Sequence, residues 1–224
     1  MGKVEAPSWL SRQRVRESVR TSNYAGWGMY DSAIESYQKS FQGVLEGIDI
    51  ISWTQSKNTL TVIDLMSSTE AIASIFESAS WDKHRLGLAV SLEDARSDLQ
   101  KERDKGLNVE KLDGDIVLPS TWKKIKKKLK GHRADLIMER AVGGIDTLPK
   151  DFGFYEFIIS KTWEMLNENG MLLLQAPGFG RWGGFKISRW AKSLRRNNIN
   201  VVFDHDNYAI KLVKTPDSPG KLPF

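Results

Sequence analysis

The side chains best placed for chemistry belong to an apolar, strand-like run at Leu60–Leu65 and to the turn that follows it. Asp64 stands near the end of this run, which leads through polar residues 66–70 into a helical stripe. Ligands of open α/β sheets bind outside the carboxyl ends of the strands, so a nucleotide-type cofactor would lie at this turn. Asp64 would anchor the turn, and the hydroxyls of Ser67 and Ser68 would bond the ligand. The alternative is structural, with Asp64 shaping the turn and the hydroxyls capping the next helix.

A second pair of reactive side chains, Glu139 and Arg140, follows another apolar run at residues 134–138. A carboxylate in this place could orient a substrate group or take its proton, and the guanidinium could bind an anionic substrate. Glu139 and Arg140 are therefore the candidate catalytic residues. An ion pair at the edge of the sheet is the structural alternative.

Composition narrows the class of protein. The 224 residues suffice for one domain, or for one domain with an N-terminal extension, and a hydrophobic content of 40% is ample for a core. No apolar run approaches the ~20 residues that span a bilayer, and the N-terminal segment lacks the apolar centre of a signal peptide. With no cysteine and three scattered histidines, neither disulfides nor a metal site is expected. We expect a cytoplasmic protein without a membrane partner.

Positive charge is concentrated in two segments. Seven cations and no acid fall within residues 123–133, including the run Lys123–Lys130, although the whole chain carries a net charge of only +5. A second cluster, Arg12–Arg20, contains four arginines. Trp122 and Ile125 stand at helical spacing, which predicts an amphipathic helix with the lysines on its outer face. Both clusters could neutralise nucleic-acid phosphates, and the alternative is a solvated surface.

The periodicity of apolar residues predicts alternating strands and helices. Strands are expected near residues 60–65, 85–91, 109–116, 134–138, 171–175, 201–203 and 208–213, and helices near 30–48, 71–76, 93–105, 122–129, 154–165 and 187–194. Five rounds of alternation imply a parallel α/β sheet, and the terminal pair forms a hairpin. The fold class is therefore a Rossmann-like, seven-stranded, mostly parallel sheet with an antiparallel last strand and helices on both faces.

The same pattern divides the chain into three parts. Residues 1–29 form a basic N-terminal arm, residues 30–214 form the α/β domain, and residues 215–224 form a tail. The tail begins Thr-Pro-Asp-Ser-Pro-Gly, and we expect it to be disordered.

This order of elements, with its motifs, resembles class I S-adenosylmethionine-dependent methyltransferases over residues 30–214. In that family the motifs are an Asp-x-Gly-x-Gly turn, Gly-Val-Asp-x-Ser, Gly-Leu-x-Val, a strand ending in Gly-Asp, a strand opening with Asp-Leu and a Pro-Gly-Gly-like turn. The corresponding segments here are residues 64–70, 87–91, 106–109, 114–115, 135–136 and 168–170. The resemblance implies S-adenosyl-L-methionine as cofactor and transfer of its methyl group to an acceptor that the sequence does not identify.

The cofactor turn departs from the family pattern at its three glycines, which are replaced by Met66, Ser68 and Glu70. Glycine there lets the backbone approach the methionine and ribose parts of the cofactor without an intervening Cβ. Three side chains, one of them charged, are expected to narrow that approach.

The resemblance also assigns roles beyond the turn. The family's ribose-binding carboxylate corresponds to Ala89, and the nearest acids, Glu93 and Asp94, could replace it only if their loop bends back. Asp115 matches the acid that meets the adenine amino group, and Ile116 would pack on the adenine face. The implied cofactor-binding residues are Asp64, Met66, Ser67, Ser68, Ala89, Asp115, Ile116 and Glu139. Each has a structural alternative as a turn, loop or core residue.

Two functions of different class therefore remain in view. The first is a methyltransferase-like enzyme. The second is a catalytically impaired relative that binds RNA or protein through its basic clusters, an option favoured by the missing glycines and by Ala89. A dehydrogenase is a weaker third possibility, because the Gly-x-Gly-x-x-Gly turn is absent and the terminal hairpin suits methyltransferases better.

Overall fold

A computed structural model defines the fold. It describes residues 33–78, 84–92, 94, 96–140, 152–175, 187–206 and 208–224. The expected N-terminal arm, with the Arg12–Arg20 cluster, lies outside the described residues, and so does Glu93.

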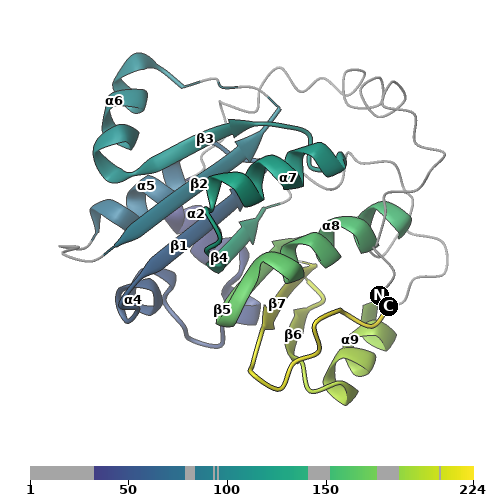
Figure 1. Cartoon of the computed structure of the whole chain (residues 1–224). Coiled ribbons are helices and arrows are strands. Elements are labelled where there is room, and N and C mark those ends of the chain that lie inside the picture. The colour runs from purple at the N-terminus through teal and green to yellow at the C-terminus, as the bar shows by residue number, and fades with distance from the viewer. Residues whose placement is uncertain are drawn as a thin grey trace.

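A seven-stranded sheet with the order β3-β2-β1-β4-β5-β7-β6 forms the centre of the molecule (Figure 1). The strands are β1 (Leu60–Leu65), β2 (Arg85–Ser91), β3 (Val109–Asp113), β4 (Ala134–Glu139), β5 (Leu166–Gln175), β6 (Asn200–Asp204) and β7 (Ala209–Val213). All neighbouring pairs are parallel except β5–β7 and β6–β7, so β7 alone runs against the others. The predicted fold class is confirmed.

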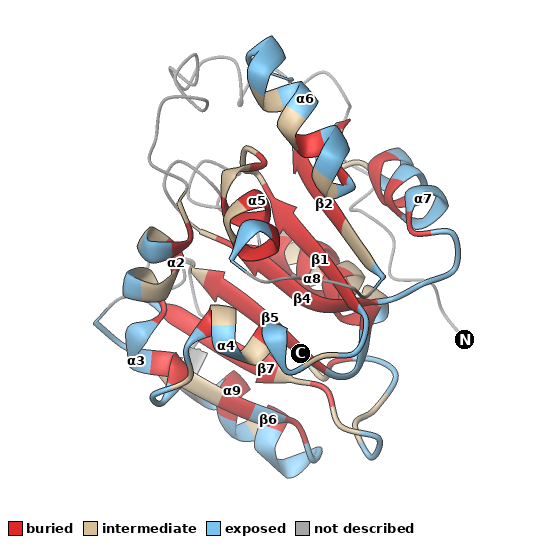
Figure 2. Cartoon of the chain, turned by 90° about the vertical axis from the view of Figure 1, so that its left-hand side faces the viewer, coloured by how far each residue is buried: buried red, intermediate tan, exposed pale blue. Residues whose placement is uncertain are grey.

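Helices cover both faces of this sheet (Figures 1 and 2). One face carries α2 (Ile34–Ser40), α3 (Gln42–Leu45), α4 (Ile50–Gln55), α5 (Glu70–Glu77) and α6 (Asp98–Leu107). The other carries α7 (Pro119–Lys128), α8 (Phe152–Met165) and α9 (Ile187–Arg196). Each layer of helices packs its apolar side chains against one face of the sheet, which gives two separate hydrophobic clusters. The central strands β1 and β4 are buried along their whole length, as expected for parallel strands covered on both sides.

Two glycines of the expected motifs are required by packing. A Cβ at Gly87 would lie 2.5 Å from Cγ2 of Ile72 on α5, and one at Gly114 would lie 2.6 Å from Cγ2 of Thr121 on α7. Side chains at these positions would push both helices away from the sheet. The retained glycines therefore serve the contact between helix and strand.

The first predicted helix, residues 30–48, is wrong as a single element. In the described residues 33–48 the structure has two helices, α2 and α3, and α3 ends where Glu46 (φ 55°) and Gly47 (φ 85°) adopt left-handed backbone conformations. The Asp49 carboxylate then accepts a hydrogen bond of 2.7 Å from the backbone nitrogen of Ser52 and starts α4. Apolar spacing continued through the breaks, which concealed them.

Other boundaries also move. Helix α6 begins at Asp98 instead of residue 93, because Ser97 and Gln100 form a capping box. Strand β3 ends at Asp113, before the expected residue 116. Residues 167–170, expected as a turn, lie within β5, whose register against β4 shifts between Ala134 and Leu136.

The C-terminal segment corrects the expectation of a disordered tail. Its Leu222 is buried in the cluster beneath α8 and α9. The indole nitrogen of Trp163 donates to the Pro219 carbonyl at 2.9 Å, and that of Trp190 donates to the Pro223 carbonyl at 2.7 Å. Residues 215–224 are thus fastened across both helices. The proline-rich composition of this segment suggested disorder. The contacts that order it are made by backbone carbonyls, which the pattern of side chains does not reveal.

Candidate functional site

The carboxyl ends of β1, β2 and β4 meet at one edge of the sheet and bring the predicted residues together there. Asp64 pairs in register with Ala89 on one side and with Met138 on the other, and Leu65 pairs with Glu139. Asp64 and Glu139 are both fully buried. Neighbouring parallel strands therefore place two candidate carboxylates at the same edge, as the sequence predicts.

Asp64 is bound by a residue that the sequence did not single out for function. The hydroxyl of Tyr37, on α2, lies 2.8 and 3.0 Å from the two carboxylate oxygens of Asp64 and donates to that carboxylate. The Ser67 hydroxyl lies 3.0 Å from the same Tyr37 oxygen. Helix α2 is thus docked directly onto the turn after β1.

The electrostatics of this cluster follow from burial. Burial raises the pKa of Asp64 from 3.8 to about 7, and the hydrogen bonds from Tyr37 and Ser67 together with the nearby charges of Arg140 and Lys111 limit the rise. Burial and the Asp64 charge raise the pKa of Tyr37 well above its ordinary value. The guanidinium carbon of Arg140 lies 5.1 Å from the centre of the Tyr37 ring, a cation–π contact. Near neutral pH, the Asp64 carboxyl divides between its protonated and ionised forms.

The turn after β1 keeps a glycine-like path although the glycine is absent. Met66, at the first of the three replaced positions, has a φ of 61°. This left-handed conformation costs a residue with a Cβ roughly 1–2 kcal/mol. The Met66 nitrogen donates to the Val90 carbonyl at 2.6 Å, which fixes the turn against β2. The backbone geometry of the turn is therefore held by its contacts.

The second and third replaced positions have local partners. The Ser68 hydroxyl accepts from the Glu70 backbone nitrogen at 3.3 Å. The Glu70 carboxylate is held by α6, where Arg103 donates at 2.8 and 3.0 Å and Gln100 at 2.6 Å. The hydrogen bonds from Arg103 lower the pKa of Glu70. The charge expected to narrow the turn is thus engaged by the neighbouring helix.

Asp94, considered as a replacement for the ribose-binding carboxylate, is likewise engaged. Arg96 donates to it at 2.9 and 2.8 Å, and this pairing lowers the pKa of Asp94 to about 2. The same guanidinium reaches Asp104 on α6 at 2.9 Å, and Arg103 reaches Asp104 at 3.1 Å. We call Glu70, Arg103, Asp104, Arg96 and Asp94 the α6 ion network.

Ala89 occupies the core and offers the site no polar group. It is fully buried in the cluster shared with α5 and pairs in register with Lys111 on β3. The Lys111 side chain is only 2% exposed, and its ammonium group bonds the Ser91 hydroxyl at the end of β2 and lies 3.8 Å from an Asp113 oxygen. Burial lowers the pKa of Lys111 to about 8. A lysine therefore lies beside Ala89, the position that corresponds to the family's ribose-binding carboxylate.

Asp115 and Ile116 lie between β3 and α7, at the same edge of the sheet. The Asp115 carboxylate accepts from the Val117 nitrogen at 3.1 Å, which forms a turn before α7. Ile116 is buried in the α7 cluster, and its carbonyl accepts the Trp122 indole proton at 2.6 Å. Both residues already have a structural role in starting α7.

Sequence reasoning missed Tyr37 and Lys111 for different reasons. Tyr37 falls within the apolar spacing that predicted a helix near residues 30–48, although its hydroxyl was a signal, since buried tyrosine hydroxyls need a partner. Lys111 stands in a strand of weak apolar character, where a charged residue was not expected to be buried. In the described residues, no group of three or more His, Asp or Glu side chains suits a metal ion. No described helix is long and apolar enough to cross a membrane.

Comparison with known proteins gives a fold but no close relative. No family model and no curated protein matches the chain. The MycE methyltransferase from the mycinamycin biosynthetic pathway, solved in complex with Mg and SAH, superposes with a TM-score of 0.53 at 10% identity, covering 97% of this chain and 61% of that one. A second crystal form gives 0.52 at 10% identity, covering 84% and 50%. This chain therefore spans less than two thirds of MycE. It has the fold of class I S-adenosylmethionine-dependent methyltransferases.

Proposed function

We propose that this chain binds S-adenosylmethionine and transfers its methyl group to an acceptor. The observation that carries the proposal is the conformation of Met66. Its φ of 61° places the turn after β1 in the left-handed region that glycine favours, beside the buried carboxylate of Asp64. A strained left-handed residue persists only where its surroundings hold it, and such strain clusters at ligand sites.

The residues present fit the cofactor in part. The turn at Ser67 and Ser68 would hold its methionine and ribose portions, and Asp115 with Ile116 would hold the adenine. When bound, the cofactor supplies an activated methyl group on a sulfonium. Methyl transfer then depends mainly on positioning, so Glu139 would orient the acceptor and Arg140 would bind an anionic group on it.

Calorimetric titration of the chain with S-adenosylmethionine and with S-adenosylhomocysteine tests this proposal. We expect saturable binding, weakened about 10-fold by Asp115→Asn, because a hydrogen bond to a charged acceptor is worth roughly 1.5 kcal/mol or more. Asp217→Asn is the matched control, since Asp217 is exposed in the C-terminal segment. No heat at millimolar ligand from a chain that still unfolds cooperatively would refute the proposal.

A second candidate is a methyltransferase-fold protein that has lost cofactor binding and serves as a binding module. The observation favouring it is the engagement of polar groups within the chain. Lys111 bonds Ser91 near the position of Ala89, and Asp94 is held by Arg96. Among these residues, the carboxylate that could bind ribose hydroxyls is that of Asp94, and it is already paired with Arg96. The calorimetric result decides between the two candidates.

A further inference from the structure

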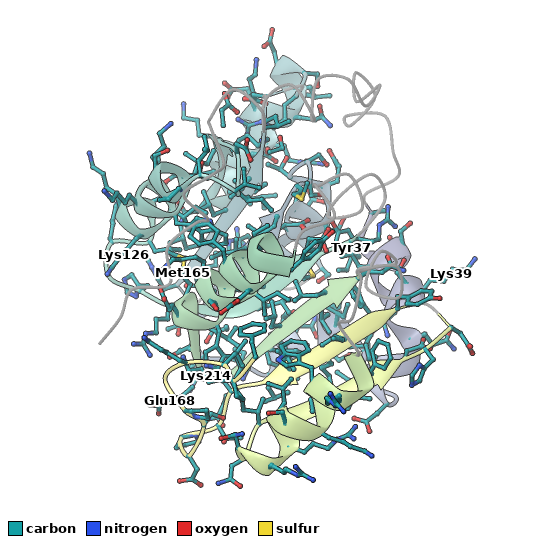
Figure 3. The ribbon with its side chains drawn as sticks, turned by 90° about the vertical axis from the view of Figure 1, so that its right-hand side faces the viewer. Tyr37, Lys39, Lys126, Met165, Glu168 and Lys214 are labelled. Carbon is teal, nitrogen blue, oxygen red and sulfur yellow. The ribbon has the colours of Figure 1, made fainter. Side chains whose placement is uncertain are left out.

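We propose that α7 and α9 together form a surface that binds the phosphate backbone of RNA. Both helices lie on the same face of the sheet with α8 between them, and Figure 3 shows Lys126 on the outer side of α7. We call their exposed cations the α7/α9 basic face. Its members are Lys123, Lys124, Lys126, Lys127, Lys128, Lys130, Arg133, Arg189, Lys192, Arg195 and Arg196. The proposal is independent of whether the chain binds S-adenosylmethionine.

The apolar side of each helix fixes these cations toward solvent. On α7, Trp122 and Ile125 are buried in the core. On α9, Trp190 and Leu194 are buried in the same cluster. Neither helix can rotate its charges inward without exposing a tryptophan, so the basic face is a permanent feature of the folded chain.

The basic face is poorly neutralised by the chain itself. Residues 119–134 and 187–203 contain no acid. In the part of the chain that the structure describes, the ion pair formed by these cations joins Lys128 to Glu110, and Arg195 donates to the Val201 carbonyl at 3.3 Å. Most of the charge is therefore available to an outside partner.

The density of charge favours a polynucleotide. The five lysines of α7, between Lys123 and Lys128, lie along ~7.5 Å of helix axis at 1.5 Å per residue. A nucleic-acid duplex presents one phosphate per ~1.7 Å of its axis, about four over the same length. Lysines spaced this closely are a better match for a regular row of phosphates than for scattered carboxylates on a protein surface.

The scarcity of exposed apolar side chains on the basic face argues against a lipid or protein partner. Among the described residues, the exposed large hydrophobic side chains are Leu92, Leu99, Tyr208 and Phe224, of which Phe224 borders the basic face by stacking on Trp190 of α9. A helix that inserts into a lipid surface needs such side chains on its outward face, and the centre of a protein–protein interface is rich in aromatic residues. Contact with phosphates needs only the cations.

Fluorescence anisotropy of the full chain with a labelled 20-base-pair RNA duplex tests the proposal between 50 and 200 mM KCl. We expect binding that weakens steeply with salt, because bound cations release counterions from the phosphates. Lys123→Gln, Lys126→Gln and Lys127→Gln combined should reduce affinity at least 10-fold and flatten the salt dependence by up to about one unit of log–log slope per lysine. Lys192→Gln with Arg196→Gln should act in the same direction.

The matched control removes three exposed lysines from the opposite face: Lys39→Gln, Lys101→Gln and Lys105→Gln. We expect the affinity of this control to stay within about 2-fold of the parent chain, because its lysines lie outside the basic face. The control is matched because both triple variants lose the same net charge. Equal losses in the two triple variants would overturn the proposal, as would salt-independent binding or tighter binding to anionic phosphatidylserine vesicles. Binding that disappears only when Arg12, Arg14, Arg16 and Arg20 are replaced would also overturn it. Titration with S-adenosylmethionine should be unchanged in the α7 variant.

Discussion

Helices α6 and α7 flank the same end of the sheet on opposite faces, and they are attached to it by different forces. Within α6 the buried residue is Asp104, whose carboxylate joins the α6 ion network. Within α7 the buried residues are Thr121, Trp122 and Ile125. One helix therefore uses its charges to hold its position, whereas the other is held by apolar contacts and leaves its charges to solvent.

This difference shows how to interpret charge in this chain. Within the described residues, opposite charges are paired around α6, whereas cations predominate on the α7/α9 basic face. We expect substitution of the paired charges to change the stability of the fold, and substitution of the exposed cations to change the affinity for a partner. The predictions below separate the two.

Trp122→Ala should produce the largest loss of stability. Removing a buried aromatic side chain costs about 3–5 kcal/mol, and the indole hydrogen bond to Ile116 is lost as well. Urea unfolding followed by circular dichroism measures this loss. It should be the same at low and high salt, because the lost contacts are mainly apolar.

The counterpart on the other face is Asp104→Asn. It leaves Arg103 and Arg96 without one of their shared anions, and because both guanidinium groups are partly exposed we expect a loss of about 1–2 kcal/mol. In 1 M KCl the difference from the parent chain should shrink. A salt-independent loss at Asp104, or a salt-dependent one at Trp122, would contradict the contrast between the helices.

Asp64, on the α2 side of the sheet, should give the fold an unusual pH dependence. Its pKa is about 7 in the folded chain against an ordinary 3.8, so between these values the folded state binds more protons than the unfolded state. Stability from this group is therefore highest below pH 4, falls as pH rises through 7, and is constant above. The full change is on the order of 2–4 kcal/mol.

Asp64→Asn should remove that component, which urea titrations at pH 5, 6, 7 and 8 would detect. Tyr37→Phe is the second variant, because it deletes a hydrogen bond that favours the ionised carboxylate and so raises the pKa of Asp64 further. A parent chain whose stability rises from pH 5 to 8, with Asp64→Asn following the same curve, would refute the burial of this carboxyl.

Met66 should give the smallest effect. Met66→Ala keeps the left-handed strain, whereas Met66→Gly removes it, so the glycine variant should be the more stable by about 1 kcal/mol. At Ser67, which has no positive φ, the order should reverse, because glycine ordinarily costs roughly 0.5–1 kcal/mol relative to alanine. Thermal unfolding of the four variants measures both differences, and the same order at both positions would exclude strain at Met66.

The local pattern of apolar residues was sufficient to predict the sheet, but it predicted little of the candidate site. The spacing of Trp122, Ile125 and Leu129 predicted α7 with its outer lysines, and all three are buried. The final hairpin followed from the turn at residues 204–207 between two β-rich runs. The strands that carry Asp64 and Glu139 to one edge were also predictable, since strand ends follow from periodicity.

What the sequence could not supply was contact across long separations. Tyr37 meets Asp64 across 27 positions, and Glu70 meets Arg103 across 33. Neither pairing can be read from the neighbouring sequence, because the way in which a helix packs on the sheet or on another helix decides which polar side chains meet. The replacement of glycine by Met66 was visible in the sequence, but the left-handed backbone of Met66 was not, since tertiary contacts override local preference there.

The place of β7 in the sheet has a consequence for the order of assembly. It is the last strand in the chain, yet it lies inside the sheet between β5 and β6. Until it arrives, β5 presents the apolar sequence Met171-Leu-Leu-Leu as an open edge, which is the kind of surface that recruits strands from other molecules. We expect a fragment cut within the β6–β7 hairpin to aggregate, because β5 then keeps an unpaired apolar edge.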